Sequence, residues 1–307
     1  MNKKELEKNS LPPVSNRLKT VADMVPEGSK IADVGTDHGF VPIYLALNHR
    51  IEHAIAMDVR KGPLERATLH VEEYGLNDMI ETRLSDGLEK LKEGEADTMI
   101  CAGMGGPLMR RILESNPPRR FGLKTLILEP QSEIMNFRIF LRENGYEIQK
   151  EDFLLEDGKY YPVIKAHVID LEEQDNKDKY CNKTYRDNMT DTSIDTDTGI
   201  DTDTGIDTDI EISMLPDSYK DAIFETRKRL KDKNIIVTDS QLVRLCDRFG
   251  PCILLSGKAD FKSFLVHGNE VCDTILSKIK DAGKSHQGRF DQVSLEQADI
   301  KMALHLF

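Results

Sequence analysis

Residues 31–47 read IADVGTDHGFVPIYLAL, and this stretch decides the expected fold of the chain. An apolar run ends at Gly35, a polar loop follows, and a second apolar run comes after it. The first run is typical of a buried strand and the second of a buried helix. A strand that enters a helix through a glycine loop leaves backbone N–H groups beside a ligand. The stretch therefore predicts a binding loop in an α/β fold.

Apolar segments of the same kind recur through the first 170 residues, at 30–36, 53–59, 80–86, 97–103 and 124–130. Helical spacing lies between them, and Pro63 and Gly75 are placed to begin and end one such helix. Continuous apolar strands separated by helices are typical of a parallel sheet with helices on both faces. We therefore predict a doubly wound, Rossmann-like α/β sheet. The E-D-G-K turn at 156–159 predicts an antiparallel hairpin at its end.

Composition divides the chain into three parts. Residues 1–170 carry the α/β pattern, and residues 213–307 form a smaller, mostly helical domain, in which 235–237 could be a short strand. Residues 171–212 hold 13 acidic and 4 basic residues, most of the excess behind the net charge of −12. Their I-D-T-D-T-G repeat lacks the third acid and the final glutamate of a calcium-binding loop. We predict an acidic, low-complexity linker here, with a metal site as the alternative.

Several classes of protein are disfavoured by composition. The chain has no apolar run of 18 residues, so we predict no membrane span. Its first ten residues are charged and lack an apolar signal segment, which predicts a cytoplasmic protein. Five cysteines occur without a C-x-x-C pair, which favours reduced thiols over a zinc site or disulfides. We expect no bound metal.

Basic residues form two clusters that could bind phosphates or simply be solvated helix faces. The clusters are Arg110, Arg111, Arg119 and Arg120 in the first part, and Arg227, Lys228, Arg229, Lys231 and Lys233 in the last.

The loop chemistry points away from a phosphate ligand. Asp37 stands between Gly35 and Gly39, where dinucleotide-binding loops approach a pyrophosphate. A carboxylate there would repel a phosphate, so the loop suits a cationic or neutral ligand. S-adenosylmethionine fits, because it carries an ammonium and a sulfonium and no phosphate. The alternative is an ordinary tight turn between strand and helix.

Two further acids follow the next predicted strands. Asp58 ends the second strand, where α/β nucleotide folds place a carboxylate on ribose hydroxyls. Asp86, followed by Gly87, ends the third strand and can reach an adenine edge. Each acid could instead cap the next helix. Because parallel strands share one carboxyl edge, three acids at three consecutive strand ends predict a single ligand site.

The segment CAGMGGPL at 101–108 ends the fourth predicted strand. Gly103, Gly105 and Gly106 could form a side-chain-free surface for a flat base, or only a tight turn. The N-P-P segment at 116–118 is similar to an amino-methylating signature. It lacks the aromatic residue of that signature and follows a helix, so we interpret it as a loop.

Taken together, these motifs closely resemble the bacterial tRNA (adenine(22)-N1)-methyltransferase family. The matching segments are SNRLKTVADMVPEGSKIADVGTDHGFVPIYL, AIAMDVRKGPL, RLSDGLE, GEADTMICAGMGG, LILEPQ and EDGKYYPVI, within residues 11–168. The resemblance implies a class I methyltransferase sheet, S-adenosyl-L-methionine as cofactor and tRNA as partner. It also implies a helical C-terminal domain that helps to bind tRNA, and RFGPCILL at 248–255 resembles its opening segment.

Site residues follow from the same resemblance. The cofactor site would comprise Arg17, Leu18, Asp33, Gly35, Asp37, His38, Asp58, Asp86, Gly87 and Gly103. The acceptor side would comprise Met104, Gly105, Gly106, Glu129, Pro130 and Gln131, with Asp37 beside them. The chain departs from the family where it reads L-E-P-Q at 128–131, since the family usually reads L-Q-P-N.

The expected mechanism is direct displacement at the sulfonium methyl. Adenine N1 has a lone pair and is neutral near pH 7, so it needs no base. Orientation alone can supply about 7–11 kcal/mol. Asp37 and Glu129 are candidates to stabilise the cationic product, and His38 is expected to bond the cofactor loop. The alternatives are methylation of a small molecule or protein, a nicotinamide oxidoreductase, and a non-catalytic RNA-binding protein.

Overall fold

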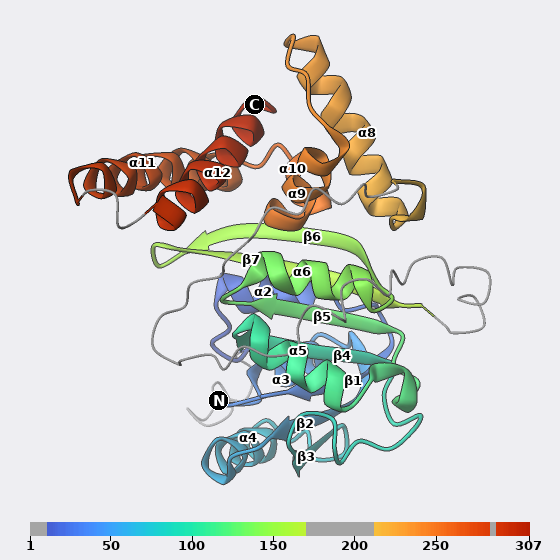
Figure 1. Cartoon of the computed structure of the whole chain (residues 1–307). Coiled ribbons are helices and arrows are strands. Elements are labelled where there is room, and N and C mark those ends of the chain that lie inside the picture. Colours follow the sequence, from blue (N-terminus) through green and yellow to red (C-terminus); the bar gives the residue numbers. More distant parts are fainter. Residues whose placement is uncertain (1–10, 170–211, 283–286) are drawn as a thin grey trace. The chain divides into compact units, whose positions relative to one another are not determined.

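The computed structural model describes residues 11–169, 212–282 and 287–307 (Figure 1). The chain forms two compact units, Met1–Asp170 and Leu171–Phe307. The predicted acidic linker and its alternative metal site lie outside the described residues, as do the first ten residues. Among the described residues, no helix has both the length and the apolar character needed to cross a membrane.

A seven-stranded sheet forms the centre of the first unit, in the order β3-β2-β1-β4-β5-β7-β6. Its strands are β1 Ser29–Val34, β2 Ile51–Asp58, β3 Ile80–Leu84, β4 Thr98–Met104, β5 Thr125–Pro130, β6 Tyr146–Glu156 and β7 Lys159–Val168. The first five pair in parallel, and β7 runs antiparallel to β5 and β6. The five predicted strands are confirmed to within about two residues at each end.

Both faces of the sheet are covered, which confirms the doubly wound prediction. The helices are α2 Asn16–Asp23, α3 Phe40–Leu47, α4 Lys61–Glu73, α5 Gly106–Ser115 and α6 Ile134–Glu143, with a 3₁₀ turn η1 at Pro118–Phe121. One core joins Val21 of α2 and Ile43 of α3 to Ile31, Ile100 and Ile127 of the strands. Side chains alternate along a strand, so the neighbours of these residues face the opposite side, where α5 packs beside α6.

The predicted hairpin joins β6 to β7 through Asp157 and Gly158. Both residues have positive φ, 49° and 75°, as a type I′ turn requires. Glycine adopts this conformation without steric cost, and aspartate tolerates it better than most side chains. The hairpin therefore closes the sheet with the antiparallel pair that the sequence predicted.

The second unit is helical in its described residues. Its elements are η3 Ile212–Met214, α8 Asp217–Asp232, α9 Asp239–Phe249, α10 Pro251–Leu255, α11 Ala259–Ala282 and α12 Gln287–Leu304. The possible strand at 235–237 was wrong: these residues connect α8 to α9, and Ile236 is 98% exposed. A strand there would need a neighbouring strand, and a capping box between Thr238 and Gln241 begins α9 directly afterwards.

A buried carboxylate joins two helices of this unit. Asp299 of α12 is fully buried and accepts hydrogen bonds from Arg244 and Arg248 of α9. A buried charge is costly unless it is paired, so the two guanidiniums fix where α12 packs on α9.

Candidate cofactor and acceptor site

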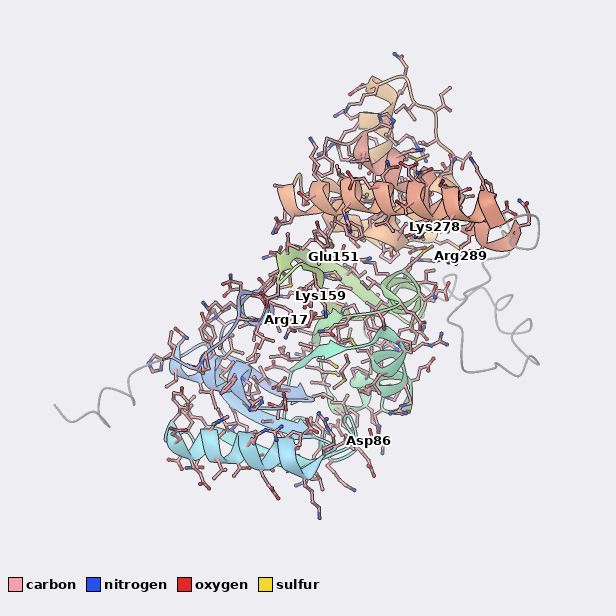
Figure 2. The ribbon with its side chains drawn as sticks, turned by 90° about the vertical axis from the view of Figure 1, so that its left-hand side faces the viewer. Arg17, Asp86, Glu151, Lys159, Lys278 and Arg289 are labelled. Carbon is pink, nitrogen blue, oxygen red and sulfur yellow. The ribbon has the colours of Figure 1, made fainter. Side chains whose placement is uncertain are left out.

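A cavity of about 490 Å³ opens at the carboxyl edge of the parallel strands. Residues from the ends of β1, β2, β3 and β4 line it, together with α2 and α5. Figure 2 labels Arg17, on α2, and Asp86, after β3, which both contribute to its wall. The volume lies within the usual range for sites that bind small molecules and cofactors.

The cavity brings together most of the residues that the sequence singled out. Those lining it are Arg17, Leu18, Asp33, Gly35, Asp37, His38, Asp58, Asp86, Gly87, Gly103, Met104 and Gln131. The remaining predicted residues, Gly105, Gly106, Glu129 and Pro130, lie behind the wall and do not line it.

Three N–H groups of the glycine loop are already bonded within the protein. The N–H groups of Gly35 and Thr36 both donate to the carbonyl of Met57, at 2.8 and 2.9 Å, and Gly39 N–H donates to Thr36. These donors are therefore not free for a ligand, contrary to what a strand–loop–helix pattern suggests. The preference of the loop for a ligand without phosphate stays a prediction.

Backbone conformation and close packing explain why Gly35 is glycine. Its φ is +77°, and a Cβ at this position would lie 2.1 Å from the terminal methyl of Met104. The acceptor loop after β4 thus lies directly over the cofactor loop after β1. The Met104 methyl is the end of a flexible side chain and could move, so the positive φ is the stronger reason for glycine at this position.

Asp33 is the most perturbed acid of the cavity. It is buried, and its carboxylate accepts a 2.6 Å hydrogen bond from the Thr36 hydroxyl. Burial raises the pKa of Asp33 to about 6, the Thr36 hydrogen bond opposes this shift, and the charge of Asp58 adds to it. A cationic ligand would favour the ionised carboxylate and relieve this penalty.

The other acids of the cavity differ in their partners. Asp58 is buried and accepts a 2.8 Å hydrogen bond from the backbone N–H of Arg60. Asp37 is half exposed and pairs with Arg66 at 3.1 Å. Asp86 is exposed at the cavity wall. Asp58 and Asp86 therefore present acceptors to the cavity, while Asp37 is already partly neutralised.

His38 belongs to a stack of three rings. Its ring lies 5.3 Å from that of Phe40, and Phe40 lies 4.8 Å from His70. Its buried Nδ1 has no hydrogen-bond partner among the described residues, and its Nε2 lies 3.6 Å from Asp37. The His38 ring therefore makes no hydrogen bond to the loop among the described residues, and its predicted bond to the cofactor loop stays a prediction.

Glu129 ties the acceptor side together from beneath the cavity wall. One oxygen of this fully buried carboxylate accepts hydrogen bonds from Arg17, at 2.5 Å, and from Gly103 N–H, at 2.8 Å. Burial raises the pKa of Glu129, and the charge of Arg17 lowers it. The Arg17 guanidinium also lies 5.2 Å over the ring of Tyr161. One acid of β5 therefore positions α2 and the end of β4.

Seven apolar contributors to the cavity escaped the sequence interpretation: Val34, Phe40, Val41, Val59, Ala102, Leu108 and Ile112. Leu108 and Ile112 are four residues apart on α5, so helical spacing after the glycine-rich loop could have identified them. Val59 directly follows Asp58 and is 59% exposed, yet no local pattern distinguishes it from other residues at strand ends.

The first basic cluster is not a single surface. Arg119 donates to the carbonyls of Asn144, Gly145 and Ile169, so three of its hydrogen bonds stabilise the fold. Phosphate binding by this residue stays a prediction. Arg110 pairs with Glu114 at 2.9 Å. The N-P-P segment is confirmed as the connection from α5 to η1.

Comparison with known proteins defines the class first: residues 14–164 match a family described as "Methyltransferase domain". The chain is 43% identical over 157 residues to the tRNA (adenine(22)-N(1))-methyltransferase of Bacillus subtilis (strain 168). That alignment covers 51% of this chain and 66% of the Bacillus enzyme, slightly under two thirds. Over the aligned residues the chain is therefore similar to the tRNA (adenine(22)-N1)-methyltransferase family, the family that its motifs resemble.

Solved structures extend the likeness beyond the aligned region. The crystal structure of the B. subtilis m1A22 tRNA methyltransferase TrmK matches with a TM-score of 0.68 and 26% identity, over 96% of this chain and all of that one. M. capricolum TrmK, solved with S-adenosyl-homocysteine, matches with a TM-score of 0.60 and 20% identity, over 95% and 98% of the two chains. The second likeness supports the fold alone.

The buried Asp33 gives a stability prediction. Because its pKa is raised above the unfolded value of 3.8 to about 6, the folded state binds more protons between these values. Wild-type stability should therefore fall as pH rises from about 4 to 6. Asp33→Asn should escape this loss and be more stable than wild type at pH 8 by roughly 1–3 kcal/mol, with a smaller difference at pH 4. Urea denaturation of both proteins at pH 4 and pH 8 measures this difference in the free energy of unfolding.

The matched control is Asp78→Asn, at an exposed site. Its effect should be small and independent of pH. An Asp33→Asn protein no more stable than wild type at pH 8 would contradict the proposed cost of burying this charge.

Proposed function

We propose that the protein transfers a methyl group from S-adenosyl-L-methionine to N1 of an adenine in tRNA, at position 22. The observation that carries this proposal is a cavity lined by Asp33, Asp37, Asp58 and Asp86, in a chain whose first unit is similar to this family. Such a cavity suits a cofactor that is cationic and carries no phosphate. A tRNA substrate would also place the protein in the cytoplasm.

The residues of the cavity fit this cofactor. Asp58 would accept hydrogen bonds from the ribose hydroxyls, and Asp86 from the adenine amine. Asp33, whose buried charge is destabilised, would interact with the ammonium group. When bound, the cofactor supplies an electrophilic methyl group on a sulfonium.

The chain's own contribution is orientation and electrostatics. Adenine N1 needs no base, so holding it in line with the methyl group is the main requirement. Gly103 and Met104 line the cavity, with Gly105 behind them, where the base would enter. Glu129 and Arg17 fix this loop, and the Glu129 charge would stabilise the cationic product. Glu129 would therefore act by positioning the acceptor loop and through the electrostatic effect of its charge, without touching the base.

The second unit offers a surface for the rest of the tRNA. On α8, Phe224 is 68% exposed, and Lys228 and Lys231 follow on the same helical face. An exposed aromatic ring with neighbouring cations suits an RNA strand, because bases stack and phosphates pair. Arg227 pairs with Asp239, so it contributes less to this surface.

A methyltransferase for a small molecule or protein remains the second candidate. The mildly acidic character of the first unit favours it, since an acidic surface repels RNA. Such an enzyme would bind the cofactor without salt-dependent binding of tRNA.

A methyl-transfer assay tests the proposal. Labelled S-adenosyl-L-methionine and unmodified tRNA transcripts should give 1-methyladenosine at position 22, identified by nucleoside mass spectrometry. Retained cofactor binding without label in any tRNA would instead favour the second candidate.

Two substitutions test which acid, Glu129 or Asp37, stabilises the cationic product. Glu129→Gln keeps an oxygen for Gly103 N–H but removes the charge that pairs with Arg17, so kcat should fall roughly 10-fold or more. Asp37→Asn should have a smaller effect, because Asp37 is half exposed and already paired with Arg66. Single-turnover rates at saturating cofactor measure both. Equal rates for Glu129→Gln and wild type would exclude an electrostatic role for Glu129.

The α8 surface has its own test. Phe224→Ala should weaken tRNA binding about 5- to 100-fold, as loss of one stacked base would. Its binding of S-adenosyl-homocysteine should not change. Leu69→Ala, at another exposed apolar residue, is the matched control. If both variants bind tRNA like the wild type, α8 is not the contact surface.

A further inference from the structure

Three arginines line the cavity, and two of them have an anionic partner. Arg17 is paired with Glu129, and Nε of Arg60 lies 3.6 Å from Asp58. Arg111 has neither an ion pair nor a hydrogen-bond partner within residues 11–169, 212–282 and 287–307. An exposed guanidinium without an anion at a cavity wall is available to bind an anionic group of a ligand.

The neighbours of Arg111 on α5 place it beside the acceptor loop. Leu108, Arg111, Ile112 and Ser115 recur at helical spacing, so they lie on one face, and the first three line the cavity. Arg111 is five residues after Gly106, or about 7.5 Å along the helix axis. A nucleotide whose base enters at the glycines could reach this arginine with its backbone.

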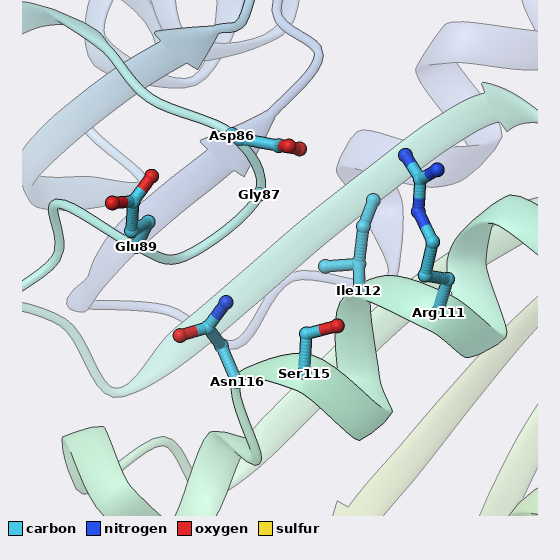
Figure 3. A pocket seen from close by; sticks show the side chains of 7 residues that line it. All are labelled: Asp86, Gly87, Glu89, Arg111, Ile112, Ser115 and Asn116. Carbon is cyan, nitrogen blue, oxygen red and sulfur yellow. The ribbon is translucent and has the colours of Figure 1, made fainter.

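A side chamber of about 120 Å³ adjoins the main cavity near Arg111. Figure 3 shows Asp86 and Arg111 projecting from opposite walls, with Glu89 and Asn116 farther along the chamber. If the cofactor adenine lies against Asp86, as proposed above, its methionine carboxylate lies at the far end of the molecule. The cofactor therefore brings no anion to Arg111.

The anion for Arg111 must then come from the second substrate. We propose that the Arg111 guanidinium binds a backbone phosphate next to the adenosine that is methylated. This inference rests on the proposed function and adds a residue that positions the substrate. It also selects one member of the first basic cluster, since Arg110 pairs with Glu114, Arg119 bonds carbonyls and Arg120 does not line the cavity.

Adjacent arginines on one helix allow a matched test. Arg111→Ala is compared with Arg110→Ala, and dissociation constants for an unmodified tRNA transcript are measured from 50 to 300 mM salt. Arg111→Ala should weaken binding about 10-fold at low salt and reduce the slope of log K against log salt by about 0.7–0.9, as loss of one phosphate contact does. Arg110→Ala should keep the wild-type slope, and Arg111→Lys should recover most of it.

Calorimetry with S-adenosyl-homocysteine supplies the second readout. Its dissociation constant should be the same for wild type and Arg111→Ala. A weakened constant together with an unchanged salt slope would place Arg111 in the cofactor site and overturn the inference. Equal slopes for Arg111→Ala and Arg110→Ala, in a protein whose wild type methylates tRNA, would overturn this inference alone. A wild type that neither binds nor methylates tRNA would overturn the proposed function with it.

Discussion

Parallel pairing of the first five strands is the constraint on which the site depends. Parallel strands end at the same edge, so residues that are 20 to 30 positions apart along the chain meet there. The registers that join Asp33 to Ala56 and Asp58 to Leu84 bring the ends of β1, β2 and β3 into one line. Each loop that follows contributes its first residues to one cavity. A change in any of these registers would disperse the acids.

The site combines buried charge with local compensation. Asp33, Asp58 and Glu129 are all buried, and burying a carboxylate is unfavourable without hydrogen bonds or a partner. The Thr36 hydroxyl donates a hydrogen bond to Asp33, and the Arg60 N–H donates one to Asp58. Arg17 and the Gly103 N–H donate to Glu129. The compensation is incomplete at Asp33, whose pKa is raised to about 6, and at Glu129, whose pKa is also raised. This residual cost makes the cavity receptive to a cation.

The partner of each arginine indicates whether it stabilises the fold or is available to bind a ligand. Arg119 holds three carbonyls together, and Arg17 fixes the acceptor loop through Glu129. Arg244 and Arg248 enclose Asp299 in the second unit. Arg111 lacks such a partner among the described residues and stands at the cavity. Total charge is therefore a poor guide to where RNA can bind, because most of these cations are already neutralised.

The sequence by itself determined the fold class, the five parallel strands, the hairpin and most of the cavity residues. The strands and the hairpin follow from local periodicity and turn residues, and the acids at the strand ends follow from the rule that parallel strands share an edge. Other cavity residues, such as Arg17, His38 and Gln131, were expected only from the resemblance to a known family. Only the tertiary structure decided that Glu129 is fully buried, that the N–H groups of Gly35 and Thr36 are bonded to Met57, and that 235–237 is not a strand. The reason is that such outcomes depend on partners far away along the chain: Arg17 and Glu129 are 112 residues apart. No local pattern predicts which distant group a side chain will meet.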